Sequence, residues 1–541
     1  MTGNRDSAGI FNVSRHALLT PCLIASATCA VYLAAPTKNY FFDGLKFAQS
    51  IEDSKSLSPA LIDPNHLIYR VVGYLVFRAS VGAGLHVRAL SVLQSLSSFV
   101  AALTTFLFFC TMCGAFGSPR LAAVLTLLLG FSATWWKFAT DADCYIPSVF
   151  FLVICFHLLL PERPSRPWLV AAAHSTAMVF HQIALPFFPA ALVGLLTQTA
   201  GQSWRRRLAT LLVYVSGTIL LTSIAYTLGF SLTQEEHRLP AFLRWITTRA
   251  PDATFRFSLR NNLLLSLRGN VRLFLGGRVN FAAAAMPEFT VISIVVLTIL
   301  FLLLSVLIVR PRRRGGPSYT RDRGPRENSA PLLWPSVTWV VAYLVFLFFW
   351  LPQDTYYRLF YLPAILTLLG VFLKYANDRV GSEIRRAMPV AVAIIALSNF
   401  TFLILPYSTL TANPPLRFAL EMNQVWRGNA VVYYATDSPD VWLLRYFSPG
   451  TRWLFLEDPD LGMIEKDLKR IYSEGHKVWI ETSAIDALTS RYANFPEWLE
   501  EHSQGTQRYQ LIYPGYRFRI DQVLPLTAVR TGAPAQQANS P

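Results

Sequence analysis

Apolar runs of about 16 to 25 residues follow one another through most of this 541-residue chain. A helix of that length crosses the ~30 Å hydrocarbon core of a bilayer. Only 15% of the residues are charged, whereas a soluble domain carries about a quarter. We therefore expect an α-helical polytopic membrane protein with about eleven transmembrane helices. The expected spans are approximately 16–35, 89–111, 119–136, 145–160, 167–181, 183–198, 208–230, 289–309, 331–351, 359–374 and 387–406.

The first span is open to a second interpretation, because "ATCA" within it resembles the cleavage site of a signal peptide. Its length and the many spans after it favour an uncleaved helix. The pair at 167–198 is equally open, since it is either two helices or one broken helix. With eleven spans, the short basic loops lie on one side, which predicts a cytoplasmic N-terminus and an extracytoplasmic C-terminus. The basic loop 231–287 would then lie outside, but long loops follow this rule poorly.

The spans divide the chain into parts. We expect a cytoplasmic N-terminus (1–16), a membrane domain (17–406), an extracytoplasmic α/β domain (407–528) and a disordered tail (529–541). Within the membrane domain, 36–88 is an outer loop with interfacial helices, 231–287 is a second outer loop, and 310–330 is a basic cytoplasmic loop. In the C-terminal domain, 430–436, 452–457, 477–482 and 508–514 have the pattern of short buried strands, and 461–475 that of a helix ending on a glycine.

The charge and the cysteines exclude several classes of function. The net charge of +16 is accounted for by orientation signals and by contacts with anionic lipid headgroups, so it needs no nucleic acid. Cys110 and Cys113 have the spacing of a metal or redox pair but lack a second pair of ligands, and Cys144 stands alone near the outer face. The sequence has no phosphate loop, HExxH or dinucleotide fingerprint.

The ionisable residues indicate where chemistry takes place. No Asp, Glu, Lys or Arg lies in the interior of an expected span, which argues against an ion-coupled transporter. The polar residues gather instead at the outer ends of the spans. They are Asp43, His66, Arg70, Lys137, Asp141, Asp143, Tyr145, His181, Gln182, Asp354, Tyr356, Tyr357 and Arg358. In "NYFFDGLKFAQSIED", helical spacing puts Asp43 and Lys46 on a polar face close to the membrane plane.

Four stretches, taken in order, resemble the GT-C superfamily of membrane glycosyltransferases, in particular bacterial members similar to protein O-mannosyltransferases. The first is the aspartate of the first outer loop, followed by the amphipathic helix "PNHLIYRVVGYLVFR". The others are "WWKFATDADCYIPSVFFLV", "AAAHSTAMVFHQIALPFFPAALVGLL" and "QDTYYRLFYLPAILTLLG". The resemblance covers roughly residues 17 to 375. The chain departs from many relatives by a single aspartate, Asp43, where the first loop of those relatives begins with an acidic pair, and by Asn65, which leaves metal dependence open.

The resemblance implies transfer of a sugar from a polyprenyl-phosphate donor to a glycan, lipid or protein acceptor at the outer face of a bacterial inner membrane. An acceptor hydroxyl needs a base, and the departing phosphate needs positive or hydrogen-bonding groups. Asp43 is the expected catalytic base, and Arg358, Lys137 and His66 are candidates for the phosphate. Asp143 with Tyr145 would hold the acceptor or help to bind a divalent metal, which is the one cofactor left open. The other expected substrate-binding residues are Arg70, Asp141, His181, Gln182 and Tyr357.

Each role has a structural alternative. Asp43 would pair with Lys46, Asp143 would cap the following span, and Arg358 would anchor in the interface. His174 and His181 would form hydrogen bonds between helices, and His66 and Arg70 would contact lipid phosphates. The alternative function is a non-catalytic envelope-polymer assembly protein or a flippase for lipid-linked sugars.

Overall fold

The computed structural model describes residues 15–161, 163–247, 258–309, 332–375, 378–457 and 461–526. These residues form two compact units. Unit 1 comprises 1–37 and 50–408, and unit 2 comprises 38–49 and 409–541. The helix α2 (Phe42–Asp53) begins in unit 2 and ends in unit 1. The expected N-terminal segment (apart from its last two residues), the whole basic loop 310–330 and the tail 529–541 lie outside the described residues.

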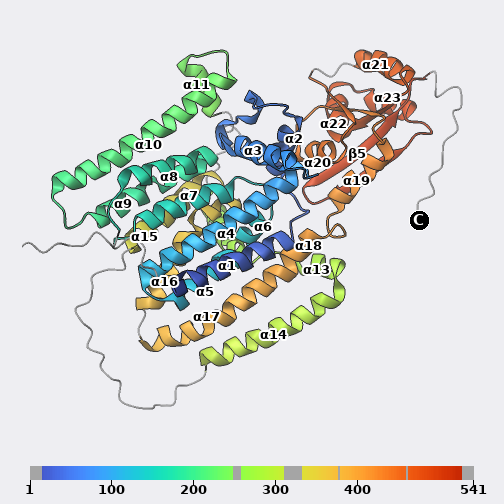
Figure 1. Cartoon of the computed structure of the whole chain (residues 1–541). Coiled ribbons are helices and arrows are strands. Elements are labelled where there is room, and N and C mark those ends of the chain that lie inside the picture. The colour runs from blue at the N-terminus through green and yellow to red at the C-terminus, as the bar shows by residue number, and fades with distance from the viewer. Residues whose placement is uncertain are drawn as a thin grey trace, which may run out of the picture. The chain divides into compact units, whose positions relative to one another are not determined.

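Unit 1 is helical, and its long helices run side by side (Figure 1). α8 contacts both α7 and α10, α4 contacts α1, α5 and α7, and α17 contacts α5 and α14. Its elements are α1 (Arg15–Ala34), η1 (Pro59–Leu61), η2 (Pro64–His66), α3 (Tyr69–Gly82), α4 (Ala89–Phe116), α5 (Pro119–Phe131), α6 (Ala133–Ala139), α7 (Tyr145–Leu158), α8 (Pro167–Phe180), η3 (Gln182–Phe187), α9 (Phe188–Gln198), α10 (Trp204–Thr233), α11 (Leu239–Ile246), α12 (Leu259–Phe274), α13 (Val279–Ala285), α14 (Pro287–Val309), α15 (Leu333–Trp350), η5 (Tyr356–Tyr361), α16 (Leu362–Tyr375), α17 (Asp378–Asn399), η6 (Phe400–Ile404) and α18 (Leu405–Ser408).

The lengths and apolar surfaces of these helices confirm a multi-pass membrane protein. Among the described residues, six helices are long and apolar enough to cross a bilayer, or seven if the bent pair α5–α6 is one span. Four further apolar helices are shorter, so the expected count of eleven is not confirmed. Most of the span in α10 and in α14 is not buried by protein. Such extensive apolar surface is stable where lipid covers it.

Two breaks in the helices shape the region that holds the candidate site. Residues 167–198 form two helices, α8 and α9, separated at His181 and η3, which settles the open question about this pair. α5 and α6 are bent by 65° at Ser132. The side-chain amide of Asn399 donates to the carbonyls of Phe131 and Phe274, both at 2.8 Å. This contact satisfies backbone carbonyls at two helix ends and therefore stabilises the bend.

The approach of two segments near this bend requires a glycine. Gly277 has φ +90°, and a Cβ at this position would lie 2.0 Å from the carbonyl oxygen of Phe402. Arg278, the next residue, donates its N–H to that same oxygen at 2.9 Å. Any other residue would have to displace the backbone of η6.

Unit 2 contains a five-stranded sheet with strand order β2-β1-β3-β5-β4. β1 is parallel to β2 and β3, whereas β5 is antiparallel to β3 and β4. The elements are α19 (Pro414–Trp426), β1 (Ala430–Tyr434), α20 (Pro439–Phe447), β2 (Arg452–Phe455), α21 (Leu461–Ser473), β3 (Lys477–Glu481), α22 (Thr482–Arg491), α23 (Phe495–His502), β4 (Arg508–Tyr513) and β5 (Tyr516–Val523). The small C-terminal α/β domain is thus confirmed.

Helices cover both faces of this sheet, because apolar side chains of its strands point to both sides. Val431 and Val478 contribute to a core with the buried faces of α21, α22 and α23. On the opposite face, Trp426 of α19 contacts Trp453 and Trp479. Neighbouring residues of a strand point to opposite faces, so β1 and β3 are buried on both sides.

Strand β5 is a strand that the sequence pattern does not predict. Its charged side chains, among them Arg519 and Asp521, are typical of a loop. In the structure Asp521 is fully buried and paired with Arg519 at 2.9 Å and with Arg508 of β4 at 3.1 Å. These ion pairs compensate the burial of the carboxylate, which allows a charged segment to lie between two strands.

A buried carboxyl group is expected to make the stability of unit 2 depend on pH. Glu481 is 2% exposed, and burial raises its pKa to about 7, against the opposing hydrogen bonds from Ser483. The unfolded chain keeps a value near 4.5. Between these values the native state binds more protons than the unfolded state, so stability falls as the pH rises, by up to about 3 kcal/mol.

We therefore expect Glu481→Gln to have a melting temperature close to that of the wild type at pH 5 and above it at pH 8. Thermal melting of both purified proteins, followed by tryptophan fluorescence, measures the melting temperatures at the two pH values. The same difference at the two pH values would contradict this explanation.

Candidate functional site

The first part of the site is a buried ion pair at the C-terminal end of the short helix α6. Lys137 and Asp141 are one helical turn apart, and the lysine ammonium donates to a carboxylate oxygen of Asp141. The side chain of Asp141 is fully buried, and that of Lys137 is 13% exposed. The other oxygen of Asp141 accepts the N–H of Ala142 at 2.9 Å. The bend before α6 therefore holds a charged pair inside the protein, with the lysine at its accessible edge.

Aromatic side chains lie beside the first residue of α7. The ring of Tyr145 stacks on Tyr356 with a centroid distance of 5.5 Å and an interplanar angle of 9°. The ring of His181 lies 5.1 Å from Tyr145 and 5.7 Å from Tyr357, and the ring of His66 lies 4.7 Å from His181. We call these five residues the His–Tyr cluster. Tyr356 and Tyr357 are only partly buried, which leaves that side of the cluster accessible.

An acid lies next to the His–Tyr cluster. The hydroxyl of Tyr356 donates to Asp354 at 3.0 Å. Burial raises the pKa of Asp354, while the Tyr356 hydrogen bond and the charge of Arg358 oppose the change. A carboxyl group with a raised pKa is a better proton acceptor once it is ionised.

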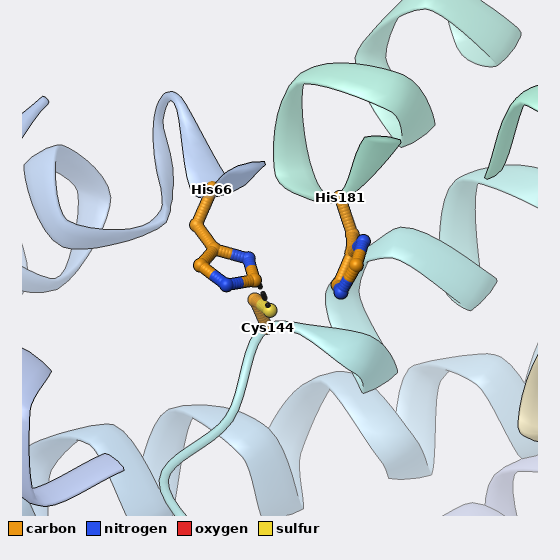
Figure 2. Close-up of side chains that lie close together, drawn as sticks. All are labelled: His66, Cys144 and His181. Carbon is orange, nitrogen blue, oxygen red and sulfur yellow. Dashed lines mark hydrogen bonds between the residues drawn. The ribbon is translucent and has the colours of Figure 1, made fainter. Parts of the chain in front are cut away.

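A thiol that sequence reasoning did not select joins the cluster. Cys144 is fully buried, and its Sγ lies 3.1 Å from Nδ1 of His66. Its thiol also donates to Oδ1 of Asp143 at 3.2 Å, and the same oxygen accepts the N–H of Cys144 at 2.6 Å. The one signal in the sequence is its position between Asp143 and Tyr145, which were both candidates. Figure 2 shows Cys144 between the rings of His66 and His181.

Two of the candidates hold the outer segment in place. Arg70 lies 3.2 Å from the carboxylate of Asp63 and donates to the carbonyl of Ala60 at 2.9 Å. Gln182 donates to the carbonyl of Pro64 at 2.9 Å, which ties η3 to η2. These contacts position His66, which follows directly on Pro64 and Asn65. A substrate-binding role for Arg70 or Gln182 stays a prediction.

Arg358 is fully buried and belongs to a network of hydrogen bonds. Its guanidinium donates to the hydroxyl of Tyr361 at 2.9 Å and to the carbonyl of Pro352 at 2.8 Å. Tyr361 in turn donates to the side chain of Asn270 at 2.9 Å. These hydrogen bonds join α12 to η5 and support the segment that carries Tyr356 and Tyr357.

Glycine at position 269 allows α12 to approach Arg358. A Cβ there would lie 2.2 Å from Nε of Arg358. We expect Gly269→Ala to displace the guanidinium and to lower the stability by about 1–3 kcal/mol, the usual cost of overpacking. Melting of the purified variant measures this. The control is Gly82→Ala, because a Cβ at Gly82 meets nothing within 4 Å. An equal effect of both variants would show that packing against Arg358 is not the cause.

Asp43 lies in the part of α2 that belongs to unit 2. It is half-buried, in the first turn of the helix. Lys46, the alternative partner that we considered for it, has its ammonium 3.4 Å from Asp437 and 5.0 Å from the ring centroid of Trp442. Since Asp43 and the His–Tyr cluster belong to different units, its role as a base stays a prediction.

Comparison with known proteins gives a fold. No family model matches the sequence, and no curated protein matches it. The structure is similar to that of ArnT from Cupriavidus metallidurans bound to undecaprenyl phosphate, with a TM-score of 0.56 at 14% identity, over 94% of this chain and 98% of that chain. The apo state of ArnT gives a TM-score of 0.54 at 14% identity, over 93% and 97% of the two chains. An oligosaccharyltransferase from Archaeoglobus fulgidus gives 0.45 at 11% identity, over 93% and 72%.

The likeness to ArnT covers 94% of this chain and therefore spans both units. The chain therefore has the fold of the GT-C membrane glycosyltransferases.

Proposed function

We propose that the protein is a membrane glycosyltransferase that moves a sugar from a polyprenyl-phosphate donor to an acceptor at the outer face of the cytoplasmic membrane. The observation that carries this proposal is the gathering of titratable and aromatic side chains at the ends of apolar helices, within a fold shared with a protein solved with undecaprenyl phosphate bound. A donor with a lipid tail presents its phosphate at the membrane interface, where such helix ends lie.

The reaction requires one bond to break and one to form. The bond between the anomeric carbon and the phosphate oxygen breaks, and the acceptor oxygen bonds to that carbon while its proton passes to a base. We assign the base to Asp43. Lys137 and His66 suit the departing phosphate, because a cation or a hydrogen-bond donor stabilises its growing charge. Arg358 acts there through the η5 segment that it supports.

The remaining residues of the site suit the transferred sugar or the acceptor. Tyr356 and Tyr357 present partly accessible rings and hydroxyls, which can stack on a sugar and bond to it, and the buried ring of Tyr145 stacks on that of Tyr356. His181 and Gln182 would bind sugar hydroxyls, and Asp143 would orient the acceptor together with Tyr145.

A direct assay tests the proposal. The purified full chain in detergent is incubated with polyprenyl-phosphate sugars and with the glycans, lipids and proteins of a bacterial membrane extract as the source of acceptor, and mass spectrometry follows the donors. We expect the loss of a lipid-linked sugar and the appearance of free polyprenyl phosphate. If the protein in lipid vesicles moves lipid-linked sugars across the bilayer without changing them, the flippase alternative is correct and the transferase proposal fails.

We also propose the orientation, because sugar transfer at the outer face requires unit 2 outside. Reporter fusions after residues 315 and 450 are expected to report inside and outside, respectively, as the short basic loops predict. An inside signal at 450 would overturn the topology and the proposed site with it.

A further inference from the structure

Three potential metal ligands meet in unit 1, and they come from three segments that are far apart in the sequence. His66 ends η2, Cys144 precedes α7, and His181 separates α8 from η3. One ligand atom of each lies within 4.8 Å of the others. Their exposed fractions are 8%, 0% and 6%. Within the part of the chain that the structure describes, this is the one group of three such side chains that is close enough to hold a metal ion.

The types of donor atom select the class of metal. One sulfur and two imidazole nitrogens are borderline-soft ligands, which suit zinc and other late transition metals and not magnesium or calcium. The buried position favours the same assignment, since a metal ion compensates the burial of a thiolate. We propose that His66, Cys144 and His181 bind one zinc ion, with a fourth position open to a water molecule or a substrate oxygen.

The geometry requires only a small adjustment. Ligand atoms on a tetrahedral zinc are roughly 3.5 Å apart, given bond lengths of about 2.0–2.3 Å. Sγ of Cys144 and Nδ1 of His66 are already 3.1 Å apart. The largest separation in the group, at most 4.8 Å, would have to shorten by about 1 Å. Figure 2 shows a ring nitrogen of His181 facing the other two side chains.

His181 makes a hydrogen bond that competes with metal binding. Its Nδ1 accepts the N–H of Ile183 at 3.1 Å, so the neutral ring carries its proton on Nε2. Binding a metal through Nε2 moves this proton and gives up the hydrogen bond to Ile183. His181 should therefore contribute less to the affinity than Cys144, whose thiol proton Asp143 is placed to accept.

The metal site is inferred from these three side chains and stands whether or not the protein transfers sugar. Its test therefore does not use activity. The purified full chain, without an affinity tag that binds metal, is stripped with a chelator and titrated with cobalt(II). We expect one tightly bound cobalt per chain, with the ultraviolet charge-transfer band of a cobalt–thiolate bond and visible bands of tetrahedral cobalt. Zinc should displace the cobalt and raise the melting temperature.

Variants assign the ligands. Cys144→Ser is expected to abolish the thiolate band and to weaken zinc binding by more than about 100-fold, beyond the effect of a change outside the ligand set. His66→Ala and His181→Ala should weaken it too, His181→Ala least. Cys155→Ser is the matched control, because Cys155 is equally buried and its thiol faces the carbonyl of Val170. That variant should bind as the wild type does.

Two results would overturn the proposal. One is a wild-type protein that gives no cobalt–thiolate band, a measurement that needs no variant to fold. The other is a band that persists in Cys144→Ser or disappears in Cys155→Ser.

Discussion

Asp43→Asn is expected to lower the rate of sugar transfer by about 10²–10⁴-fold, the usual effect of losing a general base. Asparagine keeps the size of the side chain and most of its hydrogen bonding but cannot take the proton of the acceptor hydroxyl. Binding of the donor should change little. The rate of transfer is measured as the polyprenyl phosphate that the purified variant releases. Donor binding is measured as the amount of lipid-linked sugar that stays bound to the purified variant.

Lys46→Ala is the control for this prediction. The pair between Lys46 and Asp437 is partly exposed, with side chains 30% and 49% accessible, so its loss should cost no more than about 1 kcal/mol of stability and leave transfer largely intact. Full activity of Asp43→Asn would remove Asp43 from the mechanism. Equal loss in both variants would mean that the polar face of α2 is structural.

The second large effect is expected at the buried ion pair of α6. Lys137→Met leaves the carboxylate of Asp141, which is fully buried, without its ammonium partner. Removal of one partner of a buried pair typically costs about 3–5 kcal/mol. Chemical or thermal unfolding of the purified protein in detergent measures the loss.

A second substitution distinguishes the effect of the Lys137 charge on stability from the effect of its packing. The double variant Lys137→Met with Asp141→Asn should recover a large part of the stability, because no buried charge remains uncompensated. Arg470→Met is the matched control at an exposed helical pair, Arg470 with Asp467, and should leave the stability nearly unchanged, because water screens the pair. A double variant as unstable as Lys137→Met would show that the methylene packing of the lysine matters more than its charge.

Much of the fold follows from local sequence patterns. Most of the helices of unit 1 begin and end within a few residues of the apolar runs, and the four expected strands of unit 2 are confirmed as β1, β2, β3 and β4. The helix expected at 461–475 is confirmed as α21, followed by Gly475 with φ +85°. Strand β5 was not predictable in this way, because its charged residues lack the apolar pattern of a buried strand. Only the structure shows that Arg519 of the same strand and Arg508 of the neighbouring strand compensate the charge of Asp521.

The candidate site was predictable in part. Position at the ends of apolar runs was enough to select His66, Tyr145 and His181, which the structure brings into ring contact. It could not distinguish a residue that faces the site from one that supports it. Arg358, for example, is fully buried, and it donates hydrogen bonds to Tyr361 and to the carbonyl of Pro352.

By itself, the sequence determined that the chain is a helical membrane protein with a small α/β domain and with polar residues at the helix ends, because span length and strand alternation are local properties. Only the tertiary structure decided which of those residues meet. The contact between Cys144 and His66 joins positions 78 residues apart, and Lys38–Gln49 belongs to the unit formed by the C-terminal residues. Such contacts depend on how the helices bend and pack, as at Ser132 and His181, and no local pattern records that.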